Sequence, residues 1–144
     1  MSFNPYVFFS GNCAEAFAFY SKVFGVEPHV LTNAEVPPGT ELMPGSEPHH
    51  VMHAAIDIGG SLLMGSDDPT GDGGAKTGVA VVFTAADADE VKRIVSELAE
   101  GGELQMPVEE TFWSPAFGAL VDRFGVPWMI DCPALEVDAS DDSV

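Results

Sequence analysis

Apolar and polar residues follow the same order of elements twice along the chain. In the first half, the pattern predicts a strand, a helix and three strands, at residues 6–10, 14–24, 26–31, 51–58 and 61–66. In the second half, it predicts a strand, a helix and three strands at 79–83, 87–101, 104–112, 117–122 and 127–132. Polar loops are expected at 32–48 and at 67–77, and the latter is the expected boundary between the halves.

Capping and turn residues mark the ends of these elements. Asn12 with Glu15, and Asp87 with Glu90, have the spacing of a capping box at the start of the two predicted helices. A glycine marks the end of each helix, Gly25 for the first and Gly101 for the second. The second helix has one apolar face, formed by Val91, Ile94, Val95, Leu98 and Ala99. Gly59-Gly60, between two apolar runs, predicts a tight hairpin.

This order of elements predicts an α+β fold made of paired βαβββ modules. One such module leaves one face of its sheet uncovered, whereas two modules can curl into a half-open barrel with the helices on its back. The concave cleft of the barrel is the expected ligand site. We expect a single domain with repeats at about 4–67 and 78–132, and an acidic tail at 133–144.

The charge of the chain narrows the choice of partners. Its 23 acidic residues outweigh 5 Lys and Arg, which gives a formal net charge of −18. This balance excludes nucleic acid and anionic membranes as expected partners, because both require clustered cations. A solvated acidic surface explains the charge, and adaptation to high salt is the alternative. Without an apolar run long enough to span a bilayer or a signal peptide, we expect a cytoplasmic protein.

The two cysteines, Cys13 and Cys132, lie far apart among apolar residues. Their spacing fits neither a metal motif nor a disulfide framework, so we expect buried, reduced thiols. The sequence also contains no glycine-rich phosphate loop and no serine nucleophile motif.

Three segments resemble a known family over about residues 4–132. They are Asn4-Pro5-Tyr6 with Phe19-Tyr20 and Val23-Phe24-Gly25; residues 53–67; and residues 101–128, with Thr111-Phe112-Trp113, Phe117-Gly118 and Asp122-Arg123-Phe124-Gly125-Val126-Pro127-Trp128. In these residues the chain resembles the PhnB-like branch of the glyoxalase/bleomycin-resistance/dioxygenase (vicinal-oxygen-chelate) superfamily. The resemblance implies the paired βαβββ fold and a homodimer. Its members include metal-dependent enzymes and metal-free proteins that sequester drugs, so the fold alone does not settle the function.

The resemblance also implies four metal-ligand positions on the cleft face. Aligned on the family pattern, they fall at or near Pro5, Leu63, Val79 and Met129. None of these side chains suits the divalent ions used in oxygen chemistry, so no metal and no other cofactor is expected.

A relocated metal site remains an alternative. All four histidines lie in the first half, and His50 and His53 with Asp57 or Glu47 are candidate ligands. His53 and Asp57, however, stand four residues apart on a strand, about 13 Å, which is too far to share one ion. His53 is otherwise either a hydrogen-bonded strand residue or a ligand-binding group or general base in the cleft.

Strand alternation then selects the expected cleft residues. It places Val7 and Phe9 toward the cleft with Tyr6 and Phe8 on the helix side, and Met129 and Asp131 toward the cleft with Trp128 and Ile130 in the core. Trp113 is expected near the mouth of the cleft, or else as core filling. The predicted substrate-binding residues are therefore Val7, Phe9, His53, Trp113, Met129 and Asp131.

Three functions remain open. The first is a metal-independent protein that binds an apolar or aromatic small molecule. The second is a lyase, isomerase or dioxygenase-type enzyme that uses His53, the one candidate catalytic residue, with a carboxylate such as Asp131 or with a relocated metal. The third is a structural or regulatory protein with a vestigial cleft.

Overall fold

The structure is a computed structural model that describes residues 1–71 and 74–134. Residues 135–144 of the expected acidic tail lie outside the described residues. The chain divides into two compact units between Ala75 and Lys76, and each contains one βαβββ module. The α+β fold with paired modules is thus confirmed, and each module is described by itself below.

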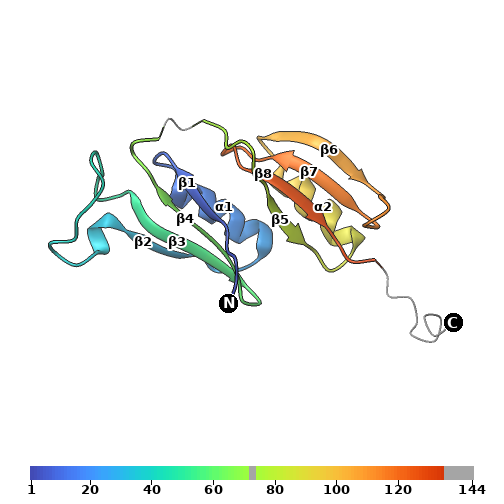
Figure 1. Ribbon diagram of the computed structural model, residues 1–144, viewed down its shortest axis with the longest axis horizontal. Helices are drawn as coiled ribbons and strands as arrows, with labels where there is room; N and C mark the ends of the chain where they lie inside the picture. Colours follow the sequence, from blue (N-terminus) through green and yellow to red (C-terminus); the bar gives the residue numbers. More distant parts are fainter. Residues whose placement is uncertain (72–73, 135–144) are drawn as a thin grey trace. The chain divides into compact units, whose positions relative to one another are not determined.

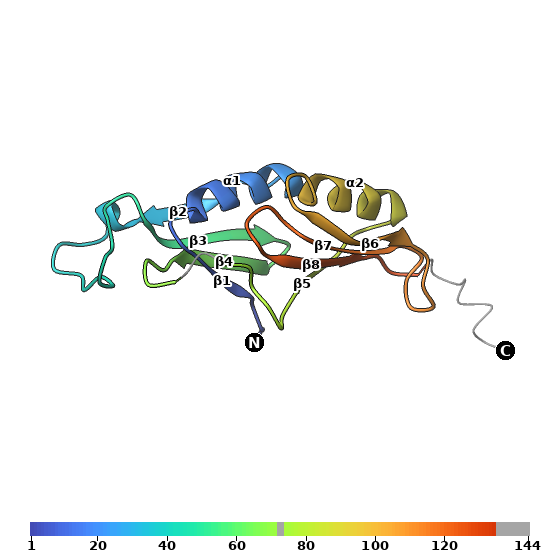
Figure 2. The same cartoon turned by 90° about the horizontal axis from the view of Figure 1, so that it is seen from above.

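The first module is a four-stranded sheet with one helix on one face (Figures 1 and 2). Its elements are β1 (Tyr6–Phe9), α1 (Cys13–Phe24), β2 (His29–Thr32), the short 3-10 helix η1 (Asn33–Glu35), β3 (Val51–Ile58) and β4 (Ser61–Asp67). The strand order is β1-β4-β3-β2, with β1 parallel to β4 and the other pairs antiparallel.

The second module repeats this arrangement. Its elements are β5 (Val81–Thr84), α2 (Ala88–Leu98), β6 (Glu103–Glu109), β7 (Phe117–Val121) and β8 (Pro127–Asp131). The strand order is β5-β8-β7-β6, with β5 parallel to β8 and the other pairs antiparallel. Helix α2 packs against β7 and β8.

Aromatic side chains join α1 to the first sheet. The ring of Phe17 packs edge-on against Phe9, with 6.2 Å between the ring centroids, and against Tyr20 at 5.6 Å. Gly65 on β4 makes room for this packing, because a Cβ atom there would lie 2.7 Å from Phe17 Cε1. Burial of these rings stabilises the contact between α1 and the first sheet.

The beginning of α1 differs from the expected capping box. The Asn12 side chain makes no cap hydrogen bond. Instead, Oδ1 of the buried Asp67, at the end of β4, accepts hydrogen bonds from the backbone N–H groups of Gly11 (2.9 Å) and Cys13 (3.0 Å). A carboxylate from a distant strand therefore satisfies the N–H of the first helical residue and that of the loop just before it.

The second helix begins and packs as expected. The Asp87 carboxylate accepts a hydrogen bond of 2.9 Å from the backbone N–H of Glu90. Four of the five residues of the predicted apolar face are buried: Val91, Ile94, Val95 and Leu98. Ala99 is the C-cap and is only half-buried.

Aspartates organise the hairpin turns of both sheets. Gly59 and Gly60 have positive φ angles of 61° and 93°, and Asp57 Oδ1 accepts a hydrogen bond from the Gly60 N–H. In the second module, Asp122 accepts hydrogen bonds from the backbone N–H of Phe124 and from Trp128 Nε1. The aspartate of the Asp-Arg-Phe-Gly segment therefore stabilises the turn between β7 and β8.

Three strand boundaries differ from the sequence prediction by two residues or more, and one loop differs in content. The second strand begins at His29 rather than at 26, β5 begins at Val81 rather than at 79, and β6 ends at Glu109 rather than at 112. The expected loop 32–48 contains η1, in which Glu35 Oε1 accepts hydrogen bonds from the N–H and the hydroxyl of Thr32. This local capping box is a short-range feature within a segment whose composition predicts only loop.

Within residues 1–71 and 74–134, no helix has the length and apolar character needed to cross a membrane. Cys13 and Cys132 are both buried and not disulfide-bonded, as expected.

Candidate functional site

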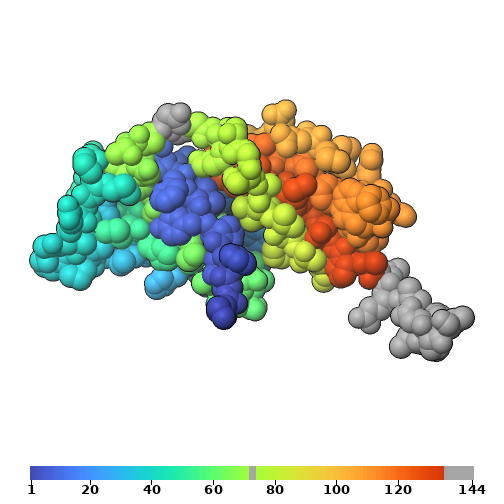
Figure 3. Space-filling view, viewed as in Figure 1, coloured from blue at the N-terminus to red at the C-terminus, as the bar shows by residue number. Residues whose placement is uncertain are grey.

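The face of the first sheet opposite α1 carries a group of aromatic and apolar side chains. We call it the first open face and define it by Tyr6, Phe8, His53, Ala55 and Met64. Residues directly opposite in paired strands share a face, and the register pairs Met64 with both Tyr6 and Ala55. Figure 3 shows the N-terminal strand, in blue, at the surface of the first module.

Two aromatic rings of this face remain exposed next to a histidine. Tyr6 is 39% exposed and Phe8 is 54% exposed, with 5.1 Å between their ring centroids. The ring of His53 lies 5.8 Å from that of Tyr6, and the Tyr6 hydroxyl is 3.5 Å from His53 Nδ1. The face therefore combines apolar surface with two groups that can donate or accept a hydrogen bond.

The expected orientation of β1 is wrong. Phe9 is only 1% exposed and packs on Phe17 of α1. Val7 is paired with Gly65, and a Cβ atom at Gly65 would point into the Phe17 ring, so Val7 lies on the same side of the sheet. Val7 and Phe9 thus face the helix, while Tyr6 and Phe8 occupy the open side. The connection from β1 to α1 is the reason, because only three residues separate Phe9 from the helix and direct its side chain beneath it.

The second sheet has an equivalent open face. Met129 on β8 is paired with Val82 and Ala119, and Asp131 is paired with Thr84. Trp128 and Ile130, the residues expected in the core, are buried on the other side. The Thr84 hydroxyl donates a hydrogen bond of 2.7 Å to Asp131 Oδ1. The alternation expected for β8 is therefore confirmed, and Asp131 already has a partner on its own sheet.

Trp113 lies in the turn before β7 and is 51% exposed. Its ring packs edge-on against Phe117, at 5.4 Å, and against Phe112, at 4.7 Å. The buried Ser114 hydroxyl lies within hydrogen-bond distance of the backbone carbonyls of Ala116 (2.6 Å) and Cys132 (2.9 Å) and donates its one proton to either of them. The indole is thus an exposed ring on a fixed turn rather than core filling.

The helix side of the second module carries a hollow of different character. It is lined by apolar and charged side chains of α2 and β6, among them Lys92, Val95 and Leu104. This hollow, on the side of the sheet away from the second open face, contains none of the predicted site residues.

The four family ligand positions carry no nitrogen or oxygen ligand. Leu63 and its cross-strand partner Ile56 are both buried on the side of the sheet that α1 covers. Pro5 and Val79 lie just before β1 and β5. Met129 is on an open face but offers only a thioether, a soft ligand. The side chains at these positions therefore do not fit the divalent metal of the wider family.

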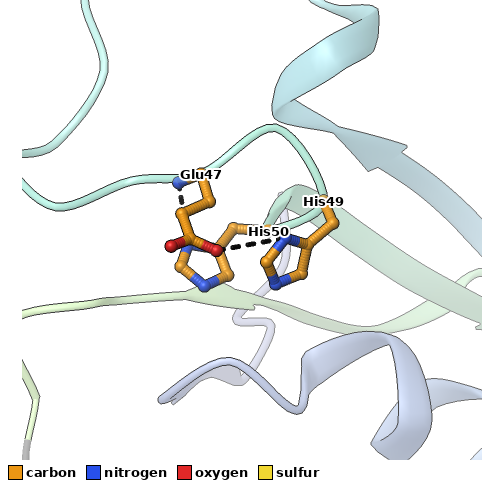
Figure 4. A group of neighbouring side chains, drawn as sticks. All are labelled: Glu47, His49 and His50. Carbon is orange, nitrogen blue, oxygen red and sulfur yellow. Dashed lines mark hydrogen bonds and ion pairs between the residues drawn. The ribbon is translucent and has the colours of Figure 1, made fainter.

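The described residues bring together a group of candidate metal ligands that differs from both expected combinations. Among the described residues, Glu47, His49 and His50 form a group in which one ligand atom from each lies within 4.8 Å of the others (Figure 4). His53 is part of the first open face instead, and the Asp57 carboxylate is engaged in the hairpin turn.

Burial determines the chemistry of the first cysteine. Desolvation, and next the nearby Asp67 carboxylate, raise the pKa of the Cys13 thiol well above its usual range. The thiolate required of a nucleophile is thus disfavoured, in agreement with the structural role expected for Cys13.

The sequence matches the model of the Glyoxalase/Bleomycin resistance protein/Dioxygenase superfamily over residues 2–130. The chain belongs to this superfamily. The family resemblance drawn from the sequence is therefore confirmed.

Several relatives of this superfamily member support the assignment. Protein YjdN of Escherichia coli (strain K12) is 33% identical over 139 residues, which cover 91% of this chain and 95% of YjdN. The crystal structure of PA1353 from Pseudomonas aeruginosa is 35% identical, with a TM-score of 0.78 and coverage of 92% of this chain and 98% of that one. A PhnB protein from Bacillus cereus shares the fold at 24% identity, with a TM-score of 0.71 and coverage of 92% and 99%.

Proposed function

We propose that this superfamily member binds an apolar or aromatic small molecule without a metal ion. The observation that carries the proposal is the exposed aromatic pair Tyr6 and Phe8 beside His53 on the first open face. Aromatic rings supply large contact areas at low entropic cost, and the imidazole and phenol supply direction. On the second open face, Met129 and Asp131 offer apolar surface and one polar group, and the exposed Trp113 lies in the turn before β7.

The donor set supports the metal-independent part of the proposal. The family ligand positions hold Pro5, Leu63, Val79 and Met129, and His53 has Tyr6 as its polar neighbour on the open face. A ligand would therefore be held by ring stacking and hydrogen bonds rather than by coordination.

A screen of small aromatic compounds, in buffer with EDTA, tests this function. Binding raises the unfolding temperature by mass action. For any hit, Tyr6→Ala and Phe8→Ala should each weaken binding by about tenfold or more, the loss typical of truncating an aromatic anchor. Phe3→Ala is the matched control, because Phe3 is a fully exposed phenylalanine outside the sheet. A screen without hits, or equal losses in Phe3→Ala, would reject the proposal.

A second candidate is an enzyme of the lyase, isomerase or dioxygenase type. The 3.5 Å approach of the Tyr6 hydroxyl to His53 Nδ1 favours it, because this pair could hold and move a proton beside a bound ligand. If turnover of any hit is found, His53→Gln should abolish turnover while leaving binding largely intact. Unchanged turnover in that variant excludes His53 as the base.

We also propose that the protein assembles as a homodimer, as its resemblance to the family implies. Sedimentation at several protein concentrations should give the mass of two chains. A chain that stays monomeric at high concentration would contradict this part alone.

A further inference from the structure

Three side chains of types that can ligate a metal project from one turn before β3. One ligand atom from each of Glu47, His49 and His50 lies within 4.8 Å of the other two. Figure 4 shows the Glu47 carboxylate next to the two imidazole rings, with a dashed line that marks its ion pair with His49. The turn belongs to the long loop of the first module, outside the residues of the first open face and outside the family's ligand positions.

The backbone that carries these side chains is held in place. The His50 N–H donates to the Glu47 carbonyl (3.1 Å) and closes the turn. Two further bonds tie the turn to η1, from the N–H of Asn33 to the His50 carbonyl (2.9 Å) and from the N–H of Ala34 to the Pro48 carbonyl (3.0 Å). A fixed backbone leaves only side-chain rotation to bring the ligands together, which lowers the entropic cost of binding an ion.

One ligand pair already has a suitable spacing. Glu47 Oε2 lies 3.3 Å from His49 Nδ1. Two ligands of a tetrahedral zinc ion, each about 2.1 Å from the metal, lie about 3.4 Å apart. The distance between the Glu47 oxygen and the His49 nitrogen is therefore that expected between two ligands of the same zinc ion.

We propose that Glu47, His49 and His50 form a surface site for a divalent zinc-like ion. Two imidazoles and one carboxylate suit Zn²⁺ and its neighbours in the transition series, whereas Mg²⁺ and Ca²⁺ prefer oxygen ligands alone. Water completes the shell, because Glu47 and His49 are largely exposed. The ion would join Glu47, His49 and His50 and so would fix the end of the long loop before β3.

One hydrogen bond must be exchanged when the ion binds. His50 Nδ1 accepts a hydrogen bond of 3.1 Å from the Glu47 N–H, so the neutral ring carries its proton on Nε2. Ligation through Nδ1 replaces this bond, and ligation through Nε2 requires the proton to move to Nδ1 and loses the same bond. In both cases the ring nitrogens of His50 change their state on binding.

Zinc titration of the full chain, after removal of metals with EDTA and dialysis, tests the proposal. Calorimetry should show one Zn²⁺ per chain, and excess Mg²⁺ should not displace it. His49→Ala and His50→Ala should each weaken binding by about tenfold or more, since even indirect partners of metal ligands contribute that much. His29→Ala is the matched control, because His29 is an exposed histidine on β2, and it should bind like the unaltered chain. In nitrogen NMR spectra, zinc should shift the ring signals of His49 and His50.

Three results would overturn the site. Without saturable zinc binding, the Glu47–His49 contact is a surface ion pair only. Binding that excess Mg²⁺ removes reflects the acidic surface of the chain rather than imidazole ligands. Binding that survives in both histidine variants but is lost in His53→Ala places the ion on the first open face. The small-molecule screen runs in EDTA, so failure of this site and failure of the proposed function are separate outcomes.

Discussion

The carboxylate of Asp67, at the end of β4, accepts a hydrogen bond of 3.0 Å from the backbone N–H of Cys13, the first residue of α1. Its other oxygen accepts a hydrogen bond of 2.8 Å from the backbone N–H of Val51, at the start of β3. With the bond from Gly11, one buried side chain joins a helix and two strands of the first module. The same carboxylate contributes to the raised pKa of the Cys13 thiol.

Replacement of Asp67 should therefore destabilise the first module strongly. Asp67→Ala leaves three backbone N–H groups without a partner, and we expect a loss of about 3 kcal/mol or more in the free energy of unfolding. Asn12→Ala is the control, because the Asn12 side chain makes no cap hydrogen bond. Denaturant unfolding measures both variants, and equal, small effects would show that Asp67 does not cap α1.

The Cys13 thiol should be inert in the folded protein. Its side chain is fully buried, and desolvation together with Asp67 raises its pKa. Alkylation by iodoacetamide, followed by peptide mass spectrometry, should label Cys13 slowly in the native state and rapidly in denaturant. Native labelling as fast as that of a free thiol would contradict the packing of α1 against the first sheet.

The position of Gly65 beneath Phe17 gives a test of that packing. In Gly65→Ala, the new Cβ would lie 2.7 Å from Phe17 Cε1 and 2.8 Å from the Val7 carbonyl oxygen. We expect a cost of about 1–3 kcal/mol, typical of an overpacked core. Gly118→Ala is a milder comparison, with Val95 Cγ2 at 3.0 Å, and should cost less in thermal unfolding. A stabilised Gly65→Ala variant would show that β1 and β4 do not present this side to α1.

Thr32 should control the ionisation of Glu35. The Thr32 N–H, and next its hydroxyl, donate to the Glu35 carboxylate and lower its pKa below the usual value. Because the folded pKa is lowered, this stabilisation is complete above the ordinary pKa of a glutamate and is lost as the pH falls through the folded value.

NMR titration of the Glu35 carboxyl carbon measures this effect. Thr32→Val should raise the pKa of Glu35 part of the way to its ordinary value, because the backbone donor remains. Thr40→Val is the control, since the Thr40 hydroxyl donates to the Pro37 carbonyl and not to a carboxylate. An unchanged titration in Thr32→Val would argue against the capping box at η1.

The order of elements could be predicted from the sequence because it depends on short-range patterns. The second helix shows this best, since Asp87 caps it and the apolar face from Val91 to Leu98 is buried as expected. The cap of α1 could not be predicted in this way. Asp67 is 54 residues away from Cys13, and no local spacing connects the two.

The candidate site was predicted in part. Alternation separated Met129 from the buried Trp128 and Ile130 correctly, but it cannot say which of the two faces of a sheet a helix covers. For β1 that choice was wrong, and the short connection after Phe9 was the available signal. Glu47 and His50 were among the candidate metal ligands predicted from the sequence, but they were combined with His53. The turn that brings His49 beside them lies in a loop, where strand alternation gives no information.

Mapping a bound ligand by NMR tests the central claim most directly. The protein would be titrated, in the presence of EDTA, with the strongest aromatic hit of the screen while backbone and ring signals are followed. We expect saturable changes in chemical shift that are largest at Tyr6, Phe8 and His53. Shifts confined to the hollow of α2 and β6, or binding that appears only when a metal is restored, would contradict it.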